Sequence, residues 1–167
     1  MLKIKNIKYK NNEDFYKIVD MVAKVENSPI ILLSTSEEAR EFFIQQLTET
    51  LLERYNIQLH NTTPDSIINK LIESVMERDL NLSDWKEFLN VGQALCIDGI
   101  EFFKNKTSLQ KELWLFLRDF NKPLILGLRD NISKEDKGFI PQFREFVERG
   151  KVIKLALKNN IVSIQEV

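Results

Sequence analysis

The sequence predicts a three-layer α/β fold, in which a parallel sheet of about five strands lies between two layers of helices. Segments with apolar residues at helical spacing alternate along the chain with short continuous apolar runs. Continuous apolar runs are typical of strands that are covered on both faces. Strands that alternate with helices favour a parallel sheet with helices on both sides. The 167 residues form one predicted domain, because no linker or internal repeat divides them.

The first part of the chain predicts an arm followed by alternating helices and strands. Two overlapping capping boxes, Ser34 with Glu37 and Thr35 with Glu38, mark the start of the second helix. The apolar stripe of the third helix, which ends at Val75, is expected to face the core. The predicted elements are, in order, an N-terminal arm of residues 1–12 with a loosely alternating edge strand at 2–9, a helix over 14–24, a strand over 30–33, a helix to about 55, a short strand over 57–60 and a helix over 62–75.

The second part continues the same alternation. A buried strand begins at Ala94 and ends at the acidic residue Asp98. The tail of residues 161–165 is predicted to be a C-terminal strand, which a turn at 158–160 could pair with the preceding strand in a hairpin. The other predicted elements are a short helix around 85–89, a helix over 109–120, a strand over 123–128, a helix over 139–149 and a strand over 152–157.

Composition excludes several classes of protein. The formal net charge of −1 gives no overall attraction to nucleic acid or to an anionic membrane. Cys96 is the only cysteine, so neither an intrachain disulfide nor a cysteine metal cluster can form. No apolar stretch approaches the roughly 20 residues that a membrane span needs, and the first residues lack the apolar region of a signal peptide. We therefore expect a cytoplasmic protein without a membrane partner.

The acidic strand and its neighbours resemble the bacterial replication initiator family (DnaA and its shorter relative Hda), whose members are AAA+ ATPases. Residues 94–103, with the run Ile97-Asp98-Gly99-Ile100-Glu101-Phe102, resemble the segment that delivers a carboxylate to magnesium, and residues 104–112 resemble the basic loop and helix after it. Two later segments, residues 121–127 and 142–150, match in order and spacing, so the resemblance extends from about residue 29 to 157. It implies an AAA+ core of the P-loop NTPase type with the strand order 5-1-4-3-2.

The phosphate loop of that family has no counterpart here. In the family, glycines expose backbone N–H groups to the phosphates and one lysine contacts them. In the matching register, Ser34 and Ala39 replace glycines, Arg40 replaces the lysine, and Glu41 replaces the hydroxyl residue that binds magnesium. Side chains on the loop would hinder close approach of the backbone to a triphosphate. The sequence therefore predicts that no nucleotide cofactor is bound.

The remaining catalytic positions of the family also differ. Asp98 matches the magnesium carboxylate, but Gly99 replaces the acid that orients the attacking water, and Gly127 lies near the polar sensor. Phe146 matches the arginine that completes a neighbouring subunit's site, and Arg144 would match it only in a shifted register. The resemblance thus implies a degenerate and truncated copy, without phosphate loop, helical lid or C-terminal DNA-binding domain.

Structural explanations compete with functional ones for several residues. Asp98 is expected to cap the loop after its strand; it is the one candidate for residual metal binding, and no other metal ligand is predicted. Two basic clusters are expected to be solvated surface, although either could contact a partner or nucleic-acid phosphates. Their members are Lys104, Lys106 and Lys111 in the first, and Arg144 and Arg149, with Lys151 and Lys154, in the second.

Three functions remain open from the sequence. The favoured one is a non-catalytic, AAA+-like interaction or regulatory module, whose partner is a protein such as an active replication initiator or a helicase loader. The second is a weak nucleic-acid-binding module that uses the basic clusters. The third is a nucleotide-binding enzyme with an atypical phosphate loop, in which Arg40 contacts phosphate and Asp98 holds magnesium.

Overall fold

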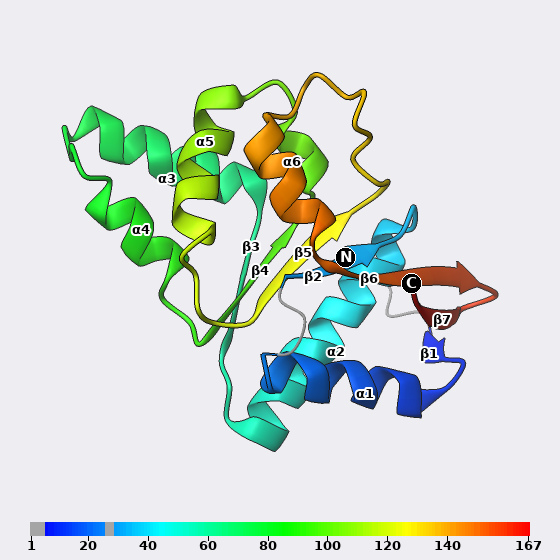
Figure 1. Ribbon diagram of the computed structural model, residues 1–167. Coiled ribbons are helices and arrows are strands. Elements are labelled where there is room, and N and C mark those ends of the chain that lie inside the picture. The colour runs from blue at the N-terminus through cyan, green and yellow to red at the C-terminus, as the bar shows by residue number, and fades with distance from the viewer. Residues whose placement is uncertain (1–5, 26–28) are drawn as a thin grey trace.

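The computed structural model describes residues 6–25 and 29–167, which form helices around a single sheet (Figure 1). The strands are β1 (Lys8–Tyr9), β2 (Ile30–Leu33), β3 (Leu59–Thr62), β4 (Ala94–Asp98), β5 (Leu124–Leu128), β6 (Lys151–Lys158) and β7 (Ile161–Glu166). The helices are α1 (Asn12–Ala23), α2 (Glu37–Tyr55), α3 (Pro64–Met76), α4 (Ser83–Leu89), α5 (Thr107–Leu117) and α6 (Pro141–Glu148), with a 3₁₀ turn η1 at Ile100–Phe103. None of the helices in the described part is long and apolar enough to cross a membrane.

The central part of the sheet has the predicted topology. The described strands are ordered β1-β7-β6-β2-β5-β4-β3, and the five from β6 to β3 are parallel to one another. Numbered along the chain, these core strands have the order 5-1-4-3-2. The α/β fold class is therefore confirmed, and so is the strand order that the resemblance implied.

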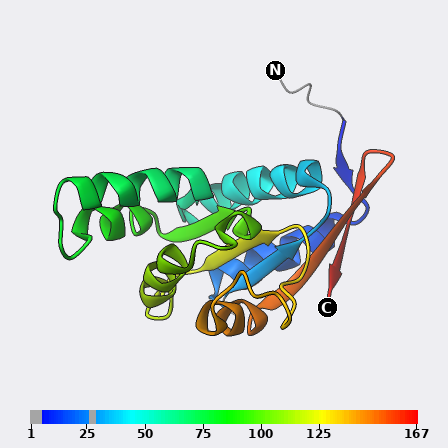
Figure 2. The same cartoon turned by 90° about the horizontal axis from the view of Figure 1, so that it is seen from above.

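Burial on both faces explains why the strands have continuous apolar sequences. In β2, Ile30 and Leu32 pack with α1 and α2 on one face, whereas Ile31 and Leu33 pack with α5 and α6 on the other. Successive side chains of a strand point to opposite faces, so every residue of β2 must be apolar. Figure 2 shows the sheet between these two layers of helices.

Two further strands extend the sheet beyond β6, in the two places where the sequence suggested an edge strand and a C-terminal strand. β7 pairs antiparallel with β6, and β1 pairs parallel with β7 through Lys8–Ile161 and Tyr9–Val162. The turn between β6 and β7 uses Asn159 and Asn160, which both have positive φ (52° and 61°). Two-residue hairpin turns favour this conformation, and asparagine tolerates it. The parallel core thus has the five strands expected, and the C-terminal strand forms the hairpin that the sequence suggested; residues 1–5 of the predicted arm lie outside the described residues.

Two local predictions were wrong. The cap of α2 is Ser36, whose hydroxyl accepts a hydrogen bond from the backbone N–H of Ala39 at 3.0 Å, so neither predicted capping box forms. The apolar stripe of α3 does not reach the core at its end, where Val75 is 61% exposed. α3 instead packs beside α4, whose buried Trp85 donates a hydrogen bond to the Ile67 carbonyl at 3.1 Å. Figure 1 shows both helices beyond the edge strand β3, where the sheet offers no surface to the end of α3.

The cap of α2 can be tested by a pair of adjacent substitutions. Ser36→Ala leaves the N–H of Ala39 without its acceptor, and we expect a loss of about 1 kcal/mol in the free energy of unfolding, measured by urea denaturation. Thr35 is exposed and caps nothing, so Thr35→Ala should change stability by less than about 0.5 kcal/mol. A larger loss for Thr35→Ala than for Ser36→Ala would contradict this assignment.

Candidate functional site

The connection between β2 and α2 lies where a phosphate loop would be, at the carboxyl end of a central parallel strand. Ligands of open α/β sheets bind at this edge. Here the backbone N–H of Ser34 donates to the Leu128 carbonyl at 3.0 Å, and that of Ser36 donates to the Ser34 hydroxyl at 3.1 Å. The N–H of Ala39 is used by the Ser36 cap. These N–H groups are therefore bonded to protein oxygens and do not form a cradle for an anion.

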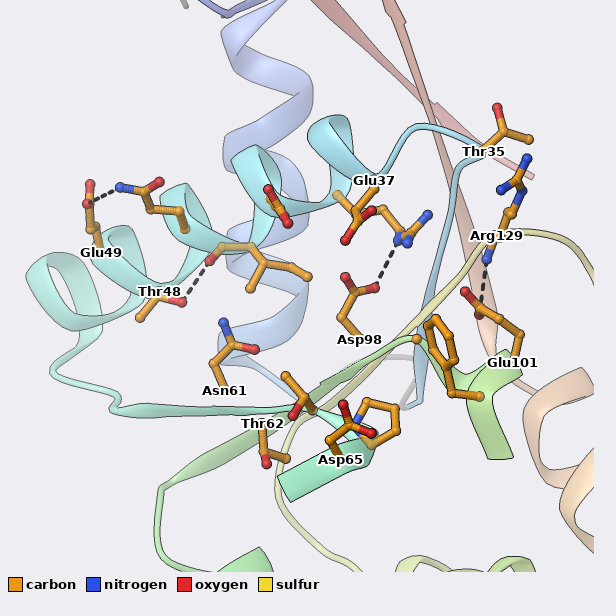
Figure 3. A pocket seen from close by; sticks show the side chains of 18 residues that line it. Thr35, Glu37, Thr48, Glu49, Asn61, Thr62, Asp65, Asp98, Glu101 and Arg129 are labelled. Atoms are coloured by element: carbon orange, nitrogen blue, oxygen red, sulfur yellow. Dashed lines mark hydrogen bonds and ion pairs between the residues drawn. The ribbon is translucent and has the colours of Figure 1, made fainter. Parts of the chain in front are cut away.

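Arg40, which the sequence analysis matched to the phosphate-binding lysine, turns its side chain inward. Its Nε donates to Oδ1 of Asp98 at 2.9 Å, and its Nη1 donates to the Ser34 carbonyl. Only 6% of the Arg40 side chain and 21% of the Asp98 side chain are exposed. The two residues that the sequence analysis assigned separately to phosphate and magnesium thus neutralise each other (Figure 3).

Two glycines make room for this ion pair and for the turn after β4. Gly127 of β5 lies in register with Asp98, and a Cβ on it would be 1.9 Å from Oδ1 of Asp98. Gly99 has φ of 96°, and a Cβ on it would be 2.9 Å from the ring of Phe102. The backbone conformation of Gly99 disfavours any side chain. An acidic residue at 99 or a polar sensor at 127 would therefore conflict with the geometry observed here.

Next to the ion pair lies a cleft of about 770 Å³. One wall is α2, from Glu37 to Glu49; the opposite wall is the segment Asn61–Asp65, where β3 leads into α3. The carboxyl end of β4 and the η1 turn form its floor, and Arg129 after β5 lines its far end. The cleft therefore occupies the edge of the sheet at which α/β proteins bind ligands.

Carboxylates dominate the cleft. Burial raises the pKa of Glu41, and the negative charges of Glu37 and Asp98 raise it further. The described residues contain no group of three or more histidine, cysteine or acidic residues arranged to hold a metal ion. Six carboxylates line the walls, namely Glu37, Glu41, Glu49, Asp65, Asp98 and Glu101.

The basic residues of the sequence analysis lie elsewhere, around the segment 129–140. Lys104 pairs with Asp136 at 3.3 Å, whereas Lys106 and Lys111 are exposed. Arg144 donates to the Lys134 carbonyl at 3.2 Å and lies 3.9 Å from Glu148. The guanidinium of Arg149 lies over the ring of Phe146, 5.7 Å from its centroid.

Sequence reasoning found one side of the cleft and missed the other. Arg40, Glu41 and Asp98 were identified, and the structure brings them together. Thr62 and Asp65 were not identified as site residues, although both line the cleft at the end of β3. Their position after a core strand was the available signal, because the carboxyl ends of parallel strands meet at one edge.

Comparison with known proteins gives the fold class. No protein-family model matches the chain, and no curated protein matches its sequence. Solved structures do match it: the fold is that of the AAA+ P-loop NTPase-like core of DnaA, the bacterial replication initiator. Domain III of the Thermotoga maritima replication initiation protein DnaA is similar, with a TM-score of 0.74 and 20% identity over 90% of this chain and 64% of that one.

Two longer solved structures give the same result. AMPPCP-bound DnaA from Aquifex aeolicus matches with a TM-score of 0.73 and 16% identity, over 92% of this chain and 49% of that one. A DNA replication initiation factor matches with a TM-score of 0.72 and 16% identity, over 92% and 48%. The chain thus spans between about half and two thirds of the structures that it resembles.

The ion pair predicts strong energetic coupling between its two members. Arg40→Met leaves a partly buried carboxylate unpaired, and we expect a loss of roughly 2–3 kcal/mol, below the ~3–5 kcal/mol of a fully buried pair because Asp98 is partly solvated. Arg40→Met/Asp98→Asn removes both charges and should recover most of that loss. Urea denaturation of the two single variants and the double variant measures the coupling; additive losses would show that the pair does not stabilise the fold.

Because the pKa of Glu41 is raised, replacing it by the uncharged glutamine should stabilise the folded protein, and the gain in stability should depend on pH. Folding disfavours the charged form of Glu41, so this carboxylate lowers the free energy of unfolding at neutral pH. The loss of stability disappears as pH falls below the usual glutamate pKa of 4.5. Glu41→Gln should therefore raise the melting temperature at pH 7 and give no gain near pH 4. Glu53→Gln, an exposed change further along α2, serves as the control; an equal gain there would show a general charge effect.

Proposed function

We propose that this chain is a AAA+-like module that has lost ATP binding and acts through contact with a protein partner. The observation that carries the proposal is the Arg40–Asp98 ion pair. Phosphoryl transfer depends on positive charge and a metal ion placed around the phosphates. Here the guanidinium and the carboxylate that would supply them are already bound to each other.

Nucleotide binding would have to reverse several features at once. Arg40 would have to leave both Asp98 and the Ser34 carbonyl, and breaking a buried pair leaves an uncompensated charge. The triphosphate would also meet Glu37 and Glu41, whose carboxylates lie at the start of α2. These costs support a module without nucleotide, and we infer a degenerate copy of the DnaA-type core.

The context that we propose is the initiation of DNA replication. The solved structures compared above are of replication initiation proteins, and one of them contains AMPPCP. A core of the same shape without ATP is suited to an adaptor or regulator of an active initiator or of a helicase loader. The basic residues Lys104 and Arg144 are engaged with Asp136 and the Lys134 carbonyl, so we favour a protein partner over nucleic acid.

A thermal-shift titration with ATP and ADP, with and without magnesium, tests the loss of nucleotide. A ligand that binds only the folded state stabilises it according to its concentration over Kd. We expect no change in melting temperature beyond about 1 °C at millimolar nucleotide, for the wild type and for Asp98→Ala alike. A purified nucleotide-binding AAA+ protein provides the positive control. A magnesium-dependent rise that Asp98→Ala abolishes would overturn the proposal.

A further inference from the structure

The outer part of the sheet leaves one of its faces uncovered. On the face toward α1 and α2, alternate residues of β6 and β7, such as Leu155 and Val162, are buried. Successive side chains of a strand point to opposite faces, so the residues between them lie on the other face. There the layer of α5 and α6 packs against β6 only near its start, at Val152, and most residues beyond it are exposed. Figure 1 shows the β6–β7 hairpin and β1 beyond these two helices.

Four lysines lie on this uncovered side, which we call the lysine face. Lys154 and Lys158 belong to β6, Lys8 begins β1, and Lys10 follows it. All four are exposed, and none forms an ion pair with another described residue. Asp14 lines a hollow beside Lys10 at the border of the face, without an ion pair between them. Because the whole chain has a formal net charge of −1, positive charge is concentrated on this face.

The register of the strands arranges the lysines in two rows with β7 between them. Ile161 of β7 pairs with Lys158 on one side and with Lys8 on the other. Neighbouring strands lie about 4.8 Å apart, so the two rows are separated by about 10 Å, and lysines two residues apart in one row are separated by about 7 Å. Between the rows, β7 presents Ile161, Ser163 and Gln165, which carry no charge.

A hollow of about 390 Å³ lies at one end of the lysine face. Lys154 and Gln165 line it, together with Thr35 after β2 and the pair Arg129–Asp130 after β5. Arg129 and Asp130 lie 4.0 Å apart and contribute no net charge. The ammonium of Lys154 and the amide of Gln165 remain as hydrogen-bond donors, and an anionic carboxylate is the acceptor that such donors bind most strongly.

The composition and size of the face favour an acidic peptide over nucleic acid. Sheets that bind single-stranded nucleic acid stack the bases on aromatic side chains, and none of the described residues on the lysine face is aromatic. Arginine is the residue best suited to phosphate, and both rows contain only lysine. Alternate side chains of an extended peptide repeat at about 7 Å, which matches the spacing within the β1 row. A short segment with an acid at every second residue therefore fits.

We propose that the lysine face binds an extended acidic segment of the protein partner, which lies along β7 with its carboxylates directed to the two lysine rows and one of them in the hollow at Lys154. The inference rests on the proposed function, which supplies the protein partner. Each carboxylate accepts a charge-assisted hydrogen bond from an ammonium group. A single exposed ion pair contributes little, so binding requires several pairs at once. Opposite charge on the two surfaces also guides their encounter.

The test uses two capped peptides, one in which glutamate alternates with serine and one in which glutamine replaces every glutamate. Each is titrated into the isotope-labelled protein and followed by amide resonances. We expect the glutamate peptide to shift resonances of β6, β7 and β1, and the glutamine peptide to bind at least about tenfold more weakly. Binding of the glutamate peptide should weaken as salt is added. Equal binding of the two peptides would overturn the proposal, and so would the absence of any binding.

Paired substitutions locate the site. Lys154→Gln/Lys158→Gln removes the β6 row, and the same double change in the β1 row removes the other; we expect each to weaken binding of the glutamate peptide by about fivefold. Lys70→Gln/Lys86→Gln removes the same charge from α3 and α4, beyond the opposite edge of the sheet, and should change binding less than about twofold. Well-dispersed amide spectra verify that each variant folds. An equal loss in this control would show a general charge effect and contradict the proposal.

Two further titrations separate the alternatives. A single-stranded oligonucleotide with the same number of charges as the glutamate peptide is added alone. We expect it to bind more weakly than the peptide; binding that is as tight or tighter would assign the face to nucleic acid and overturn the proposal. The ATP titration described above is repeated with the glutamate peptide present. If neither ATP nor the peptide binds, only this inference falls. If ATP binds while the peptide still binds the lysine face, the proposed loss of nucleotide binding falls and the assignment of the face stands.

Discussion

The buried ion pair between Arg40 and Asp98 is the interaction on which the rest of the site depends. It joins the first turn of α2 to the end of β4, and through the Ser34 carbonyl it also holds the loop after β2. Gly127 must lack a side chain, because a Cβ there would lie 1.9 Å from Oδ1 of Asp98 and would displace the carboxylate. A partly buried charge is tolerated only when a partner of opposite charge binds it. A change at Arg40 therefore calls for a matching change at Asp98.

The chemistry of the neighbouring cleft follows from that pairing. Because Asp98 and Arg40 cancel, the charge of the cleft is set by the carboxylates of α2, α3 and η1. The cleft at this edge of the sheet therefore carries net negative charge. This charge is a property of the side chains alone, since the order of the core strands is the one that the resemblance implied.

Features set by neighbouring residues could be predicted from the sequence, whereas contacts between residues far apart in the sequence could not. The run Ile30–Leu33 identified a strand buried on both faces, because side-chain alternation is local. The cap at Ser36 was missed because Ser34 and Thr35 fit the same pattern, and only the backbone selects among them. Arg40 and Asp98 are 58 residues apart; the resemblance located both positions, but their pairing with each other was not predicted. Thr62 and Asp65 were missed because only the fold brings the end of β3 opposite α2.

The extension of the sheet by β1 and β7 has a consequence for the order in which the chain folds. Lys8 and Tyr9 pair with Ile161 and Val162, so two strands that are far apart in the sequence must meet. Lys17 of α1 likewise pairs with Glu166 at 2.7 Å. Contacts between such distant segments form slowly, because a long loop must close first. The hairpin of β6 and β7 joins strands that are adjacent in the sequence, so we expect it to form first and β1 to be the last strand to join the sheet.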